Sequence, residues 1–292
     1  MRAAAQRAIT AWSWLSSLIL TGAVAAVIGF LLVKGMPAIN MRLIFGRTPA
    51  LEALLLRAPV LDGLWPAMAG TFFLVVTAVG LALPLGIGAG IYVAEYSRGR
   101  LKQGLTLLFD LLAGIPSIVV GLFGFSLTVF LHHHLSHRIY PSLLVSALAL
   151  AFLVLPYLIR GTQAALENLP ARIRVIAPAL GATKMQNILR VLVPQALDGI
   201  LSGVILAIGR CAEDTAVIML TGAVASAGLP KSLLGSFEAL PFYIYYISSQ
   251  YMNPRELRQG YGAALILLMV CAALFGVSLL LKNLLAQRLR DR

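Results

Sequence analysis

The stretch "ALGATKMQNILRVLVPQALDGI", from Ala179 to Ile200, is the least apolar long segment of a very apolar chain. The chain has 292 residues, of which 60% are hydrophobic and 12% are charged. Soluble domains are about 45–50% apolar and about 25% charged. The composition therefore predicts an integral membrane protein, and the quoted segment is expected to lie between membrane-crossing runs.

Six apolar runs approach or exceed the length of about 20 residues that a membrane-crossing helix needs. They cover residues 11–33, 66–94, 105–131, 141–159, 196–224 and 261–281. We expect an all-α integral membrane fold with six transmembrane helices and a single domain over residues 1–292. With the N-terminus inside, fourteen Lys and Arg fall in the inner segments and eight in the outer ones. This bias predicts that both termini and the quoted stretch are cytoplasmic.

The formal net charge of +12 does not indicate a nucleic-acid partner. The basic residues lie mostly in short loops beside apolar runs, and no dense basic tract is interleaved with aromatic residues. We expect contact with membrane lipid and no nucleic acid.

No metal site is expected. Cys211 and Cys271 both lie in apolar runs, where we interpret them as small packing residues. A cluster of four histidines follows the third run, at positions 132, 133, 134 and 137, without a neighbouring cysteine or carboxylate.

The quoted stretch continues a polar segment that begins near Arg160. Four apolar residues have the i, i+3, i+4, i+7 spacing of an amphipathic helix: Ile173, Ile176, Ala177 and Leu180. Gly181 is expected to end that helix, and Thr183 with Gln186 predicts a capping box that opens a second one. Pro194 is expected where the second helix meets the next span. This helix–turn–helix is either an interfacial hairpin or a docking element for another protein.

Three further features concern the helices themselves. Gly86 and Gly90 have the small-xxx-small spacing of closely packed membrane helices. They do not fit a dinucleotide fingerprint, which needs a preceding strand and the spacing G-x-G-x-x-G. Pro116, followed by Ser117, is expected to kink the third span. The chain has no G-x-x-x-x-G-K-[ST] loop, so we expect no bound ATP and no enzymatic activity of its own.

Charged residues lie inside the fifth apolar run, where they are costly. Glu213 and Asp214 follow Arg210 by three and four residues, so both carboxylates can reach the guanidinium on one helix face. The group is either a self-satisfied ion pair or the lining of a water-filled pathway. In the second case the planar guanidinium suits an oxyanion.

The quoted stretch resembles the cytoplasmic signature of ABC-importer permeases, E-A-A, three residues, G, nine residues, I, one residue, L-P. Gly181 and Pro194 are in place, whereas Val175 and Ile176 stand where a Glu-Ala pair is usual. Two more stretches, "LLAGIPSIVVGLFG" (residues 111–124) and "LPLGIGAGIYVAEY" (residues 83–96), are similar to phosphate permeases. The length and the six spans resemble the PstA family more than the PstC family.

This resemblance implies the MetI-like permease fold of type I ABC importers, with a core at about 64–285 and an extra span and outer loop at 1–63. It implies a bacterial inner-membrane location and a coupling helix that docks on a separate ATPase. The docking residues would be Ile173, Ala177, Leu180, Gly181, Ala182, Thr183 and Lys184. The implied partners are a PstC-like second permease, a PstB-like ATPase dimer that uses ATP, and a periplasmic PstS-like phosphate-binding protein. No cofactor would be bound by this chain.

The resemblance also bears on the cargo. Phosphate permeases usually show R-x-x-G-E-T, and here the segment reads Arg210-Cys211-Ala212-Glu213-Asp214-Thr215. Arg210, Glu213, Asp214 and Thr215 would line the substrate pathway, and the additional acid Glu213 is expected to weaken anion binding.

Other functions stay open from the sequence. One is a permease for another oxyanion: sulfate, molybdate, tungstate or phosphonate. An intramembrane enzyme would need a motif such as H-E-x-x-H, which is absent. A non-transporting membrane scaffold is the third possibility.

Overall fold

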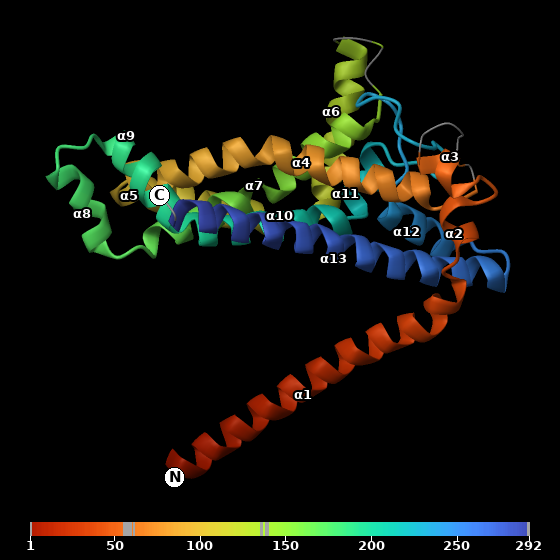
Figure 1. Ribbon diagram of the computed structural model, residues 1–292, viewed down its shortest axis with the longest axis horizontal. Coiled ribbons are helices and arrows are strands. Elements are labelled where there is room, and N and C mark those ends of the chain that lie inside the picture. The colour runs from red at the N-terminus through yellow and green to blue at the C-terminus, as the bar shows by residue number, and fades with distance from the viewer. Residues whose placement is uncertain (1, 55–59, 61, 135–136, 138–139, 291–292) are drawn as a thin grey trace.

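The computed structural model describes residues 2–54, 60, 62–134, 137 and 140–290, and the described chain is helical (Figure 1). Arg57, Arg138 and Arg292, which belong to the charge count above, lie outside the described residues. In chain order the elements are α1 (Arg2–Gly35), η1 (Met36–Ala38), α2 (Met41–Phe45), α3 (Ala50–Leu54), α4 (Trp65–Ile91), η2 (Tyr92–Tyr96), α5 (Gly99–Ala113), α6 (Ser117–His134), α7 (Leu143–Glu167), α8 (Ala171–Ala179), α9 (Lys184–Asn187), η3 (Ile188–Leu192), α10 (Val193–Glu213), α11 (Ala216–Thr221), α12 (Leu240–Gln250) and α13 (Pro254–Arg290).

Within the described residues, six helices are long and apolar enough to cross a membrane. They cover Ile9–Ala38, Trp65–Tyr96, Ser117–His134, Leu143–Glu167, Lys184–Glu213 and Pro254–Leu284. The predicted six-helix all-α membrane fold is therefore confirmed. The third and fifth spans depart most from their predicted ranges, and the fourth and sixth extend beyond theirs by up to eight residues.

The third span is shorter than predicted, because the chain breaks instead of kinking at Pro116. α5 ends at Ala113, and α6 begins only at Ser117. Proline has no N–H to donate, and it disfavours helical backbone in the residue before it. Gly114 adds a residue of low helix propensity at the same place. One apolar run thus forms two separate helices.

The fifth span starts earlier and ends sooner than predicted. The helix that begins at Lys184 passes through the π-helical turn η3 directly into α10, and Pro194 lies in the first turn of α10, where it was expected. A π-turn next to a proline accommodates the hydrogen bond that the proline cannot make. At the other end, α10 stops at Glu213, and Asp214 is extended with ψ 116°. α11 then starts a new helix.

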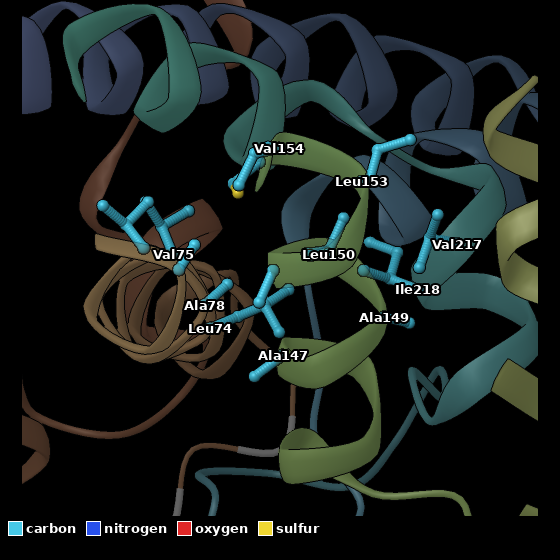
Figure 2. Packing of buried hydrophobic residues seen from close by; sticks show 14 of the residues in the cluster. Leu74, Val75, Ala78, Ala147, Ala149, Leu150, Leu153, Val154, Val217 and Ile218 are labelled. Carbon is cyan, nitrogen blue, oxygen red and sulfur yellow. The ribbon is translucent and has the colours of Figure 1, made fainter. Parts of the chain in front are cut away.

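The core surrounds α7, which lies between α4 and α11 (Figure 2). Leu74 and Ala78 of α4 pack against Leu150 of α7, while Val217 and Ile218 of α11 face its other side. Gly86 and Gly90 allow α4 to approach α7 closely: a Cβ at either position would lie 2.5 Å from a carbon of Leu158 or Thr162. These two glycines therefore lie at a tight helix–helix contact.

α1 extends away from the bundle (Figure 1). None of its most apolar stretch is buried. The last turns of α1 contact the first turns of α13, where the rings of Phe30 and Tyr261 meet edge to face with their centres 5.6 Å apart. Gly35 fits there against Tyr261 and Leu265, because a Cβ would come within 2.7 Å of each. The start of α1 and the end of α13 lie toward the same end of the molecule as α8.

The opposite end carries α12 and the segment that precedes it. Here Glu238 is only 7% exposed, and its carboxylate accepts a hydrogen bond of 2.7 Å from the backbone N–H of Gly228. Burial raises the pKa of Glu238 to about 7, because the charged form loses its hydration, although backbone N–H groups partly offset this. The adjoining backbone N–H of Leu240 donates to Thr71 Oγ1 of α4 at 2.9 Å. The bond from Leu240, the first residue of α12, ties the start of α12 to the first turns of α4.

Candidate functional site

The charged segment lies at a helix break inside the bundle. α10 ends at Glu213 and α11 begins at Ala216. Arg210 lines a cavity together with Tyr157, near the middle of α7, and Phe275 of α13. The break is therefore about midway along the crossing helices. Broken helices at mid-membrane are where many transporters bind their cargo.

Both expected ion pairs are present. Arg210 Nη1 lies 3.0 Å from Glu213 Oε1, and Nη2 lies 3.5 Å from Asp214 Oδ2. The two acids differ in environment, because the Glu213 side chain is 62% exposed and the Asp214 side chain only 2%. Asp214 also accepts a 2.9 Å hydrogen bond from the backbone N–H of Val217, which caps α11. Asp214 thus holds the break together, and Glu213 is the acid that faces open space.

The cavity at Arg210 has a volume of about 420 Å³. It is lined by Tyr157, Ser202, Ile205, Leu206, Gly209, Arg210, Glu213 and Phe275. Arg210 Nε is buried without a hydrogen-bond partner, and Thr215, one turn away at the break, is half-buried. In mostly apolar surroundings the charge interacts more strongly than in water. A guanidinium in this setting can bind a tetrahedral oxyanion through parallel N–H groups.

At the α8 end, the structure gives the predicted helix–turn–helix. α8 ends at Ala179, and Gly181 has φ +85°, which a residue with a Cβ adopts only with strain. The capping box is present: Thr183 Oγ1 accepts from the Gln186 N–H at 3.3 Å, and the Gln186 side chain accepts from the Thr183 N–H at 2.9 Å. Ala182, within the turn, is half-buried.

The apolar stripe of α8 is not a buried face. Ile173 is half-buried and packs against the apolar cluster that contains Leu166 and Ile188, and Ala177 is also half-buried. Ile176, however, is 56% exposed and Leu180 is 85% exposed. The expected stripe is therefore divided: Ile173 and Ala177 are half-buried, whereas Ile176 and Leu180 face outward.

α8 and α9 are held by polar contacts that the sequence did not reveal. Arg174 pairs with Glu95, at the end of α4 and η2, and also donates to the carbonyl of Leu166. Lys184, expected at the ATPase surface, is exposed; its Nζ donates to the backbone oxygen of Glu95 at 2.8 Å and lies 4.0 Å from the Tyr96 ring centre. The only sequence signal was a carboxylate directly after a long apolar run.

Asp110 and the histidine cluster have the following surroundings. Asp110, near the end of α5, pairs with Arg160 of α7 at 2.9 Å. Among the described residues, no three His, Cys, Asp or Glu side chains gather as metal ligands would. The ring of His132 packs against His133, His137 and Tyr140.

Comparison with known proteins identifies the family. Residues 86–291 match the family described as "Binding-protein-dependent transport system inner membrane component". The chain is 36% identical to "Phosphate transport system permease protein PstA 1" of Mycobacterium tuberculosis (strain CDC 1551 / Oshkosh), over 73% of this chain and 68% of the relative. It is 34% identical to "Phosphate transport system permease protein PstA" of Haemophilus influenzae (strain ATCC 51907 / DSM 11121 / KW20 / Rd), over 84% of this chain and 83% of the relative.

A solved structure shares the fold. The chain superposes on the MetNI methionine ABC transporter in an inward-facing conformation with a TM-score of 0.55 and 18% identity, covering 82% of this chain and 99% of that chain. This likeness confirms the MetI-like permease fold. The chain therefore belongs to the multi-pass inner-membrane permeases of binding-protein-dependent transport systems, and within them to the PstA family.

Proposed function

We propose that the chain is the PstA-type permease subunit of an ATP-driven importer of inorganic phosphate. The observation that carries the proposal is the helix break at the middle of the bundle, where Arg210 faces a cavity beside two carboxylates. The relatives above are phosphate transport permeases by description, which supports phosphate as the cargo.

Arg210 would bind the phosphate through its guanidinium. Glu213 competes for the same donors when the site is empty, because it is exposed and lies 3.0 Å from Nη1. Asp214 remains in place, since it also caps α11. Glu213 would thus neutralise Arg210 between transport events and lower its affinity for phosphate.

The energy would come from other subunits. We assign the α8 end to the cytoplasm, together with both termini, and residues 1–292 to one transmembrane domain. Val175, Ile176 and Leu180 are 62%, 56% and 85% exposed, and exposed apolar clusters of this kind mark protein contacts. They would seat in a PstB-like ATPase dimer, which uses the ATP. A PstC-like second permease and a PstS-like periplasmic receptor complete the importer, and this chain binds no cofactor.

Uptake by the four-component importer in proteoliposomes tests the cargo. Replacing Arg210 by Met should raise the KM for phosphate about 10–100-fold, because hydrogen bonds to charged groups contribute about 1.5–3 kcal/mol. Glu213→Gln should lower the KM, since it removes the competing charge. Uptake of sulfate, molybdate, tungstate or phosphonate in preference to phosphate would refute the cargo. An unchanged KM in Arg210→Met would refute the site.

Docking is tested by Leu180→Asp, with Leu180→Met as the control that keeps an apolar side chain. Leu180 contributes little to packing within this chain, being 85% exposed, so neither change should impair membrane insertion. We expect the Asp variant to lose co-purification with the ATPase and the Met variant to retain it. Equal recovery of the ATPase with both variants would contradict the docking surface.

A further inference from the structure

α8 is attached to the rest of the chain by very little apolar packing. None of its residues is buried, and Ile173 alone joins the neighbouring apolar cluster. A segment held so loosely would transmit movement poorly if apolar contacts were its main connection. Its attachment must therefore depend on polar contacts.

Arg174 provides these contacts. Its Nη1 pairs with the Glu95 carboxylate at the end of α4 and η2, and its Nη2 donates to the carbonyl oxygen of Leu166 in the last turn of α7. Its own backbone oxygen accepts a 3.0 Å hydrogen bond from Asn187 Nδ2 of α9. One residue of α8 is thus bonded to three different helical segments.

The Glu95 side of the contact is enclosed. The Glu95 side chain is 10% exposed and that of Arg174 is 27% exposed, so the pair is largely shielded from solvent. The Glu95 backbone oxygen belongs to the terminal helical turn and accepts from Lys184 Nζ, which satisfies a carbonyl that the helix leaves unpaired. A shielded charge pair is weakened less by salt than an exposed one.

We infer that Glu95 and Arg174 are positioning residues whose contact transmits movement of α8 to α4 and α7. The inference rests on the proposed function, since it assumes that an ATPase moves α8. A guanidinium bonded to two helices through a planar fork fixes direction as well as distance, which a flexible ammonium cannot do. α4 and α7 are also the two helices joined through Gly86 and Gly90, so a displacement of both would reach the core as one body.

The test uses the complete reconstituted importer and measures phosphate moved per ATP hydrolysed. The variants are Glu95→Gln, Arg174→Gln and the milder Arg174→Lys, which keeps the charge but loses the fork. Asp110→Asn is the matched control, because the Asp110–Arg160 pair lies outside α8, joining α5 to α7 at 2.9 Å. Co-purification of the ATPase is measured in each case.

We expect Glu95→Gln and Arg174→Gln to keep the ATPase bound and to hydrolyse ATP, while phosphate moved per ATP falls about tenfold. Arg174→Lys should be intermediate, and Asp110→Asn should match the wild type. If the glutamine variants do not assemble, Arg174→Lys decides: a normal ratio in that variant would overturn the inference. Normal ratios in all three variants would do the same. Absence of ATP-linked uptake in the wild type would instead refute the proposed function.

Discussion

The close contact between α4 and α7 predicts whether replacing a glycine of α4 by alanine lowers or raises the stability of the protein. Gly86 and Gly90 lie where α4 meets α7. A Cβ at Gly86 would lie 2.5 Å from Leu158 Cβ, and a Cβ at Gly90 would lie 2.5 Å from Thr162 Cβ and 2.8 Å from the carbonyl oxygen of Ile159. Carbon atoms in contact prefer about 3.5–4.0 Å, so alanine at either site must push the helices apart by about 1 Å.

The expected magnitude follows from two opposing effects. Overpacking of a core costs about 1–3 kcal/mol, whereas alanine gains about 0.5–1 kcal/mol over glycine within a helix. Gly86→Ala and Gly90→Ala should therefore each destabilise the protein, by up to about 2.5 kcal/mol. The same helix offers matched controls at Gly80 and Gly88, where a Cβ would have no neighbour within 4 Å. Alanine there should stabilise the protein by about 0.5–1 kcal/mol.

Thermal unfolding of the purified protein in detergent measures the difference. Each kcal/mol corresponds to a shift in Tm of about 2–4 °C in domains of comparable size. The Gly86 and Gly90 variants should therefore unfold below the wild type, and the Gly80 and Gly88 variants above it. If all four alanine variants shifted the Tm in the same direction, the close helix contact would be refuted.

Three further predictions follow from the ends of the bundle. Folded Glu238 keeps its proton up to about pH 7, whereas the unfolded chain releases it above the ordinary pKa of 4.5, so the stability of the protein should fall as pH rises between these values. Glu238→Gln should remove this fall in Tm, measured from pH 5 to 8. An unaltered pH dependence of Tm would contradict the raised pKa of Glu238. Thr183→Ala removes the N-cap of α9, and loss of such a cap typically costs about 1 kcal/mol of stability. Hydrogen exchange at the Gln186 N–H should therefore be faster in the variant. An unchanged exchange rate would show that the cap does not stabilise α9. Leu234 lies between α11 and α12 and is 64% exposed. Leu180→Cys should react with a membrane-impermeant thiol reagent only from the cytoplasmic side, and Leu234→Cys only from the outer side. Labelling from the opposite sides would invert the topology.

The apolar runs predicted the number of spans because hydropathy reports which residues tolerate lipid. It does not report backbone continuity. The run at 105–131 therefore concealed the break between Ala113 and Ser117, although Gly114 and Pro116 marked it. The run at 196–224 concealed the break after Glu213 for the same reason. An Asp three residues before Val217 was a capping signal that could have located it.

The candidate site was predictable only where its members are close in sequence. The i+3 and i+4 spacing of Glu213 and Asp214 was sufficient to pair them with Arg210. Tyr157 and Phe275 reach the same cavity from other helices, and no local pattern indicates that. The Glu95–Arg174 pair spans 79 positions, so only the folded packing of α4 and α7 brings it together.

The unpacked length of α1 has a consequence for how this protein can change over evolutionary time. None of the most apolar stretch of that helix is buried within its own chain. Packing within this polypeptide therefore does not constrain the side chains of that stretch, which need only be apolar. Near its end the situation reverses, since Gly35 admits no larger residue beside Tyr261 and Leu265. A single helix thus combines a stretch in which one apolar residue can replace another with an attachment point, Gly35, at which a larger residue does not fit.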